Sequence, residues 1–130
     1  MAEELTLRID LDSDIPAYRQ IVNTIRIVLV TGSLKPGAEL PSVRRMARDL
    51  GVHFNTVAES YRILAEEGWL DLRHGRGATV IERAVPQPSP EALEEFQQRL
   101  RSLVAEVVAK GTDPKKVAAE MARIWNELYT

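Results

Sequence analysis

The side chains with the clearest chemistry are basic, amide and hydroxyl groups that lie between residues 42 and 76. Guanidinium groups form paired hydrogen bonds with phosphate or guanine, and a side-chain amide matches the N6/N7 edge of adenine. Hydroxyl groups and helix ends add contacts to the phosphate backbone. This chemistry is that of double-stranded DNA binding, and the expected contact residues are Ser42, Arg44, Arg45, His53, Phe54, Asn55, Thr56, Arg62, His74, Gly75 and Arg76.

Two helices joined by a tight turn would position most of these side chains. Residues 43–50 place apolar side chains at i, i+3, i+4 and i+7, so one face of a helix is expected to be buried. Gly51 follows where a left-handed residue would end that helix. Asn55 and Thr56 are expected to cap a second helix, which has its own apolar stripe. The pattern is typical of a helix-turn-helix, whose second helix enters the DNA major groove.

A short hairpin with a basic tip is predicted to follow the second helix. Leu70 and Leu72 alternate with polar residues, residues 74–77 have turn composition, and residues 78–81 return as a second strand. Such a hairpin is a wing. The sequence therefore predicts an α+β fold with a winged helix-turn-helix DNA-binding domain at residues 1–83.

The segment before this motif is predicted to form a strand and a helix. Leu5, Leu7, Ile9 and Leu11 alternate with polar residues, which is the pattern of a half-buried strand. A helix with an unbroken apolar stripe is then expected as far as Gly32. Pro16 would lie in its first turn, and Ser13 or Asp14 would cap it.

The last part of the chain is predicted to be a Pro-rich linker, residues 84–90, and a helical hairpin, residues 91–130. Two amphipathic helices of this length cannot form a self-sufficient core, so a second copy of the chain is the expected partner. In the alternative, the hairpin folds back on its own winged domain. The expected dimerisation residues are Leu93, Phe96, Leu100, Leu103, Val107, Met121, Ile124, Trp125 and Leu128.

Composition and charge narrow the function classes. The 130-residue chain has no cysteine and 45% hydrophobic residues, and no apolar run suits a membrane span, so we expect a cytoplasmic protein with no membrane partner. The net charge of −2 is unusual for a DNA-binding protein, although the acidic residues gather outside the motif. His53 and His74 lie in different loops without further ligands, so we expect no metal site. No nucleophile lies near a base in a catalytic pattern, so we expect no enzymatic activity and no cofactor.

The motifs together resemble the DNA-binding domain of GntR-family bacterial transcription regulators. The residues that carry this resemblance are Leu40-Pro-Ser-x-Arg44, Leu50-Gly-Val52, Asn55-Thr-Val57, Leu64-x-x-x-Gly68 and Gly75-x-Gly77. Pro16-x-Tyr18-x-Gln20-Ile21 and the short helical tail resemble the YtrA-like subfamily. The resemblance implies a homodimeric repressor of a near-palindromic operator, and the YtrA-like subfamily implies control of a transporter operon. It also implies DNA contacts from Arg44, from the start of the second motif helix and from the wing turn.

Three positions depart from the family pattern, and several alternatives stay open. Arg45 stands where an acidic residue usually completes a capping box, and Phe54 and Ala58 stand where many members have arginine. One alternative is a winged-helix module that binds protein without touching DNA. Another is the DNA-binding head of a larger, aminotransferase-like regulator. The sequence leaves a small-molecule effector unknown, and we expect no enclosed ligand cavity within one subunit.

Overall fold

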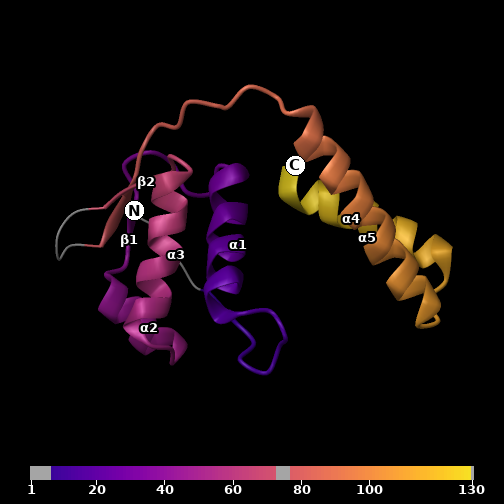
Figure 1. Ribbon diagram of the computed structural model, residues 1–130, viewed down its shortest axis with the longest axis horizontal. Helices are drawn as coiled ribbons and strands as arrows, with labels where there is room; N and C mark the ends of the chain where they lie inside the picture. The colour runs from indigo at the N-terminus through magenta and orange to yellow at the C-terminus, as the bar shows by residue number, and fades with distance from the viewer. Residues whose placement is uncertain (1–6, 73–76, 130) are drawn as a thin grey trace. The chain divides into compact units, whose positions relative to one another are not determined.

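The computed structural model describes residues 7–72 and 77–129, and its chain contacts separate two compact units, Met1–Ala84 and Val85–Thr130 (Figure 1). The boundary lies at the start of the Pro-rich segment, and the two units are described separately below. The elements of the first unit are α1 (Ala17–Val30), β1 (Glu39–Leu40), α2 (Val43–Leu50), α3 (Phe54–Glu66), β2 (Leu70–Leu72) and β3 (Ala78–Val80). Those of the second are α4 (Pro90–Ala109) and α5 (Pro114–Tyr129).

The first unit has a small antiparallel sheet with the strand order β1-β3-β2. β2 and β3 form the expected hairpin, in which Leu70 pairs with Val80 and Leu72 with Ala78. On its other side β3 pairs with β1, where Leu40 lies opposite Ala78. The sequence did not predict β1. The wing is thus tied to the chain immediately before α2.

The strand predicted at residues 5–11 is wrong for the part that the structure describes, because residues 7–10 form no strand and residues 11–15 form turns and bends. The alternating pattern reflects burial alone, since Leu7 is buried and Ile9 packs against the core. The Gln20 side chain makes backbone hydrogen bonds that a neighbouring strand would make in a sheet. The amide of Gln20 accepts from the Asp10 N–H at 2.7 Å and donates to the Asp10 carbonyl at 2.8 Å.

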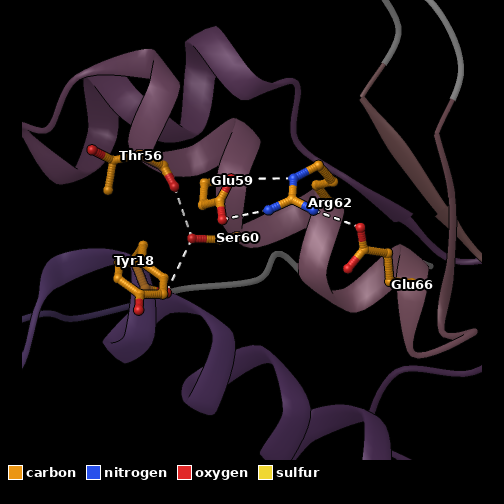
Figure 2. A network of polar contacts seen from close by, with 6 residues as sticks. All are labelled: Tyr18, Thr56, Glu59, Ser60, Arg62 and Glu66. Carbon is orange, nitrogen blue, oxygen red and sulfur yellow. Dashed lines mark hydrogen bonds and ion pairs between the residues drawn. The ribbon is translucent and has the colours of Figure 1, made fainter.

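The core of the first unit is formed by the apolar stripes of α1, α2 and α3 against the sheet. Val57, Tyr61 and Leu64 of α3 are at most 1% exposed, and Ile21 and Ile25 of α1 are fully buried. Ser60 is also fully buried, and its hydroxyl donates to the carbonyls of Tyr18 and Thr56 (Figure 2). A satisfied hydroxyl on a small side chain allows α1 and α3 to approach closely without an unpaired polar group.

The helix ends differ from the expected caps at two places. α1 begins after Pro16, which offers no side-chain cap, and the Ser13 hydroxyl instead accepts from the Ile15 N–H. Neither predicted cap of α1 is therefore correct. α3 is capped by His53, and Asn55 and Thr56 lie within the helix.

The second unit is a helical hairpin without buried residues. Ser89 caps α4, with Pro90 in the first turn, and the Asp113 carboxylate accepts from the Lys115 N–H at the start of α5. Neither α4 nor α5 contains a buried side chain. The apolar faces of both helices thus remain accessible in a single chain.

Candidate nucleic-acid interface

The N-terminus of α2 presents Ser42, Arg44 and Arg45. The Ser42 hydroxyl accepts from the Arg45 N–H at 3.2 Å, so the serine half of a capping box forms. The other half of a capping box is a side chain at position 45 that accepts from the Ser42 N–H, and arginine has no acceptor. The Arg45 Nε atom instead lies 3.8 Å from the Asp49 carboxylate. Arg44 is exposed beside it. The capping serine therefore fixes the helix start from which Arg44 projects.

The N-terminus of α3 presents His53, Phe54, Asn55 and Thr56. The Nδ1 atom of His53 accepts from the Asn55 N–H at 3.1 Å, which makes His53 the capping residue. The side chain of Asn55 is thereby not the helix cap and is exposed, whereas Thr56 is half-buried. An exposed amide at this position offers a donor and an acceptor together, as adenine recognition requires.

Phe54 connects the two helix ends. The Arg44 guanidinium lies over the Phe54 ring, with Cζ 5.4 Å from the ring centroid. The His53 and Phe54 rings are stacked with their centroids 4.5 Å apart. A cation above an aromatic face is attracted by about 0.5–1 kcal/mol at an exposed site. Phe54 thus supports Arg44 at the surface, a contact between separate helices that the sequence did not suggest.

The base of the wing packs on the start of α2 through Gly77. A Cβ atom on Gly77 would lie 3.1 Å from the Leu40 carbonyl oxygen and 3.2 Å from both the Pro41 carbonyl oxygen and the Ser42 Cα. The Tyr61 hydroxyl donates to the Pro41 carbonyl at 2.7 Å, and burial raises the pKa of Tyr61 well above its ordinary value. These contacts, which the sequence did not predict, fix α2 relative to α3 and the wing.

Three of the predicted contact residues, Ser42, Arg44 and Phe54, border one hollow. An open depression of about 330 Å³ is lined by α2, α3 and the wing, and its lining includes Ser42, Arg44, Phe54, Leu72 and Gly77. The structure thus brings the two helix ends and the wing base together. The predicted contacts His74, Gly75 and Arg76 lie outside the described residues.

Arg62 lies further along α3 in a different environment. Its guanidinium donates to the carboxylates of Glu59 and Glu66, one turn before and one turn after it (Figure 2). Hydrogen bonding with Glu59 makes the largest contribution to the raised pKa of Arg62. Two carboxylates already balance its charge, so a phosphate would have to displace them.

The side chains predicted to dimerise are accessible along α4 and α5. An open groove of about 550 Å³ runs between the two helices and is lined almost entirely by apolar atoms. Its lining includes eight of the predicted positions, namely Phe96, Leu100, Leu103, Val107, Met121, Ile124, Trp125 and Leu128, whereas Leu93 lies outside it and is 58% exposed. The groove is open rather than an enclosed cavity.

Within residues 7–72 and 77–129, no three His, Asp or Glu side chains come together as a metal site. None of the helices described is long and apolar enough to cross a membrane.

Comparisons with known proteins show the family to which the chain belongs. The family model described as bacterial regulatory proteins, gntR family, matches residues 17–80. The HTH-type transcriptional repressor YtrA of Bacillus subtilis is 30% identical over 111 residues, which cover 85% of each protein. The chain belongs to the GntR family.

A solved structure confirms the fold across both units of this GntR-family chain. YtrA from Sulfolobus acidocaldarius, a GntR-family transcription factor, is 31% identical, covers 94% of this chain and 98% of its own, and has a TM-score of 0.54. The predicted winged helix-turn-helix followed by a helical hairpin is therefore correct. The "Probable rhizopine catabolism regulatory protein MocR" of Rhizobium meliloti is 43% identical over 74 residues, but these span only 15% of that longer protein.

Proposed function

We propose that this GntR-family chain is a homodimeric, cytoplasmic transcription repressor that binds a near-palindromic operator in double-stranded DNA. The observation that carries the DNA contact is the cluster at the starts of α2 and α3. Arg44 is held over Phe54, and the Asn55 amide is exposed because His53 caps the helix. In a helix-turn-helix, the first residues of the second helix face the base edges in the major groove.

The role of each side chain follows from its chemistry. Arg44 binds a phosphate or a guanine, because its planar guanidinium can form two parallel hydrogen bonds. Asn55 reads an adenine with its paired donor and acceptor. Phe54 has no hydrogen bond to offer, and it acts by holding Arg44 and by apolar contact with a thymine methyl or a sugar. His74 and Arg76 of the wing complete the contact set.

Selection from random duplex DNA, followed by titration at several salt concentrations, tests this proposal. Each phosphate contact that is removed should lower the slope of log K against log salt by roughly 0.9, so an Arg44→Ala dimer should lose roughly 1.8 if Arg44 binds phosphate. If Arg44 binds guanine instead, the variant should lose discrimination of ~1–3 kcal/mol at one base pair per half-site. Arg99→Ala is the matched control, since Arg99 is exposed on α4 and pairs with the nearby carboxylate of Glu95.

The remaining variants separate the roles of Asn55 and Phe54. Asn55→Ser should relax the preference at one base pair without changing thermal stability, because His53 supplies the cap. Phe54→Leu should weaken binding by roughly two- to fivefold per half-site, which corresponds to one cation–π contact of about 0.5–1 kcal/mol in each subunit. In the Arg44→Ala background the same change should have little effect. A protein that selects no DNA sequence at all would favour the winged-helix interaction module.

The homodimer is supported by the exposed apolar groove of the second unit. Trp125 is 63% exposed, Leu103 61% and Phe96 58%, although all three are large apolar side chains. Exposed apolar surface of this extent on a soluble domain is usually an interaction surface. A second hairpin about a two-fold axis would complete a four-helix bundle.

Sedimentation of the full chain and of two variants tests the dimer. Trp125→Glu places a charge in the groove and should shift the equilibrium to monomer, with half-site DNA binding retained. Ser102→Glu adds the same charge at an exposed α4 position outside the groove lining, and it should remain dimeric. A monomeric wild-type chain would instead support a hairpin folded against its own winged unit.

A repressor role is supported by the Bacillus subtilis relative YtrA, which is named as an HTH-type transcriptional repressor. A reporter gene placed behind the selected operator should be silenced by the wild-type chain and released by Arg44→Ala. Stimulation of the reporter by the wild type would show an activator.

A further inference from the structure

The point where the Pro-rich linker leaves the first unit is held by one side chain, that of Arg83. Its Nε atom donates to the Glu67 carbonyl at 2.7 Å, and its guanidinium lies 4.4 Å above the centroid of the Trp69 ring. The aliphatic part of Arg83 crosses Gly68, where an added Cβ would meet Arg83 Cγ at 3.5 Å. Arg83 therefore contacts three successive residues at the junction of α3 and β2.

The residues around Arg83 are themselves fixed. The Glu67 carboxylate binds the Arg26 guanidinium of α1 and accepts from the indole N–H of Trp69. The hydrogen bond with Arg26 makes the largest contribution to the lowered pKa of Glu67. Upstream of Arg83, the Ile81 N–H donates to the Trp69 carbonyl at 3.0 Å. The chain is thus attached to the first unit as far as residue 83.

The other end of the linker is also attached. The Ser89 hydroxyl accepts from the Ala92 N–H at 3.1 Å, and Pro90 is the first residue of α4. Residues 84–88 between these points are exposed and include Pro86 and Pro88. Linkers rich in proline are semi-rigid spacers of about 3.1 Å per residue. With both ends held, such a spacer has a narrow range of lengths and directions.

We propose that Arg83 is a positioning residue that restricts which half-site spacings the dimer can bind. The inference rests on the proposed homodimer on a two-half-site operator. In a dimer the second half-site is bound at an effective concentration that the tether sets, and this falls to nearly zero when the tether cannot span the distance. Releasing Arg83 adds residues 82 and 83 to each tether, about 7 Å at ~3.5 Å per residue. This equals about two base pairs at ~3.4 Å each for each half-site, and about four base pairs between the two half-sites of a dimer.

The test measures the affinity of the full chain for operators whose half-sites are moved apart or together in steps of one base pair. The wild type should prefer one spacing sharply. In Arg83→Ala the ratio of affinities between the preferred spacing and one lengthened by two base pairs should fall by roughly threefold or more. Arg83→Gln should show the same loss of spacing preference as Arg83→Ala. It replaces Arg83→Ala in the test if the alanine variant is poorly folded. The affinity for a single half-site should not change.

Two controls separate tether length from stability and from the proposed function. Arg26→Ala breaks an ion pair of the same cluster but leaves the bond between Arg83 and the Glu67 carbonyl, so it should keep the wild-type spacing profile. Inserting Gly-Ser after Ala84 in the wild type should broaden the profile as Arg83→Ala does. If the wild type and both Arg83 variants show the same dependence of affinity on half-site spacing, with half-site binding intact, the role proposed for Arg83 is overturned. The proposed function would be unaffected. A lower half-site affinity in both variants would overturn the role proposed for Arg83 too, since Arg83 would then contact DNA. A wild type that binds no DNA would overturn the proposed function as well.

Discussion

Replacing Gly77 by alanine should displace the wing from the start of α2. Gly77 has φ +80°, a conformation that costs a side-chain-bearing residue roughly 1–2 kcal/mol. The new Cβ would also lie 3.1–3.2 Å from three backbone atoms of residues 40–42, none of which can turn aside as a flexible side chain could. Overpacking of this kind typically adds ~1–3 kcal/mol. The free energy of unfolding should therefore fall by about 2–5 kcal/mol.

Gly51→Ala is the matched control, because it shares the backbone penalty without the crowding. Gly51 has φ +71°, and its added Cβ would meet nothing within 4 Å. The difference between the two variants isolates the contact of the wing with α2, about 1–3 kcal/mol. For a domain of this size each kcal/mol corresponds to ~4–8 °C in Tm.

Urea and thermal unfolding of the full chain, followed by circular dichroism, measure this difference. Both glycines lie in the first unit, so any separate transition of the helical hairpin is common to the two variants. Gly77→Ala should also bind its operator more weakly than Gly51→Ala, since the displaced wing base adjoins Ser42. Equal losses of stability in the two variants would refute the argument from close backbone approach.

Two further predictions concern single polar contacts. Ser42→Ala should lower the free energy of unfolding by about 1 kcal/mol, because the Arg45 N–H loses its acceptor. Ser42→Asp should keep most of the stability of the wild type, because its carboxylate can accept the same hydrogen bond. Urea unfolding of both variants measures the difference. Equal losses in both variants would mean that the cap contributes nothing. Glu67 has a pKa lowered from 4.5, so its contribution to stability is full above the unfolded-state pKa and is lost as pH falls through the lower folded-state pKa. Unfolding between pH 6 and 3 should show a smaller loss of stability for Glu67→Gln than for the wild type, and parallel curves would contradict the assignment.

The elements with regular apolar spacing could be predicted from the sequence. The stripe of residues 43–50 and the left-handed Gly51 define α2 by local geometry alone, and both occur as predicted. By contrast, β1 has only two residues, Glu39 and Leu40, and exists because β3 pairs with it. The alternation at residues 7–10 indicated burial but could not show that the Gln20 side chain would take the hydrogen bonds of a strand.

The candidate site was predictable to a similar extent. Residue types and turn chemistry placed Arg44 and Asn55 at helix starts. The cap of α3 was assigned to Asn55 and Thr56 because histidine is not among the favoured capping residues, yet His53 Nδ1 is the acceptor. The position of Arg44 over Phe54 depends on how α2 packs against α3, which no local pattern encodes. The charge of Arg62 favours a DNA contact, whereas its pairing with Glu59 and Glu66 arises from the helical spacing of the three residues on α3.

The pairing of Leu40 with Ala78 gives the chain an exchangeable recognition segment. Residues 41–77, which include β2, connect β1 to β3, and their two ends lie next to Cα atoms that antiparallel pairing holds ~5 Å apart. The corresponding segment of another GntR-family regulator can therefore be grafted between these points, provided that it keeps the contacts with α1 and with Arg83. A graft must keep a small hydroxyl residue at Ser60, which bonds to the Tyr18 carbonyl on α1, and it must keep Glu67, Gly68 and Trp69, which contact Arg83. In such chimaeras, the grafted segment should determine which operator sequence is bound. The recipient's linker should determine which half-site spacing is preferred.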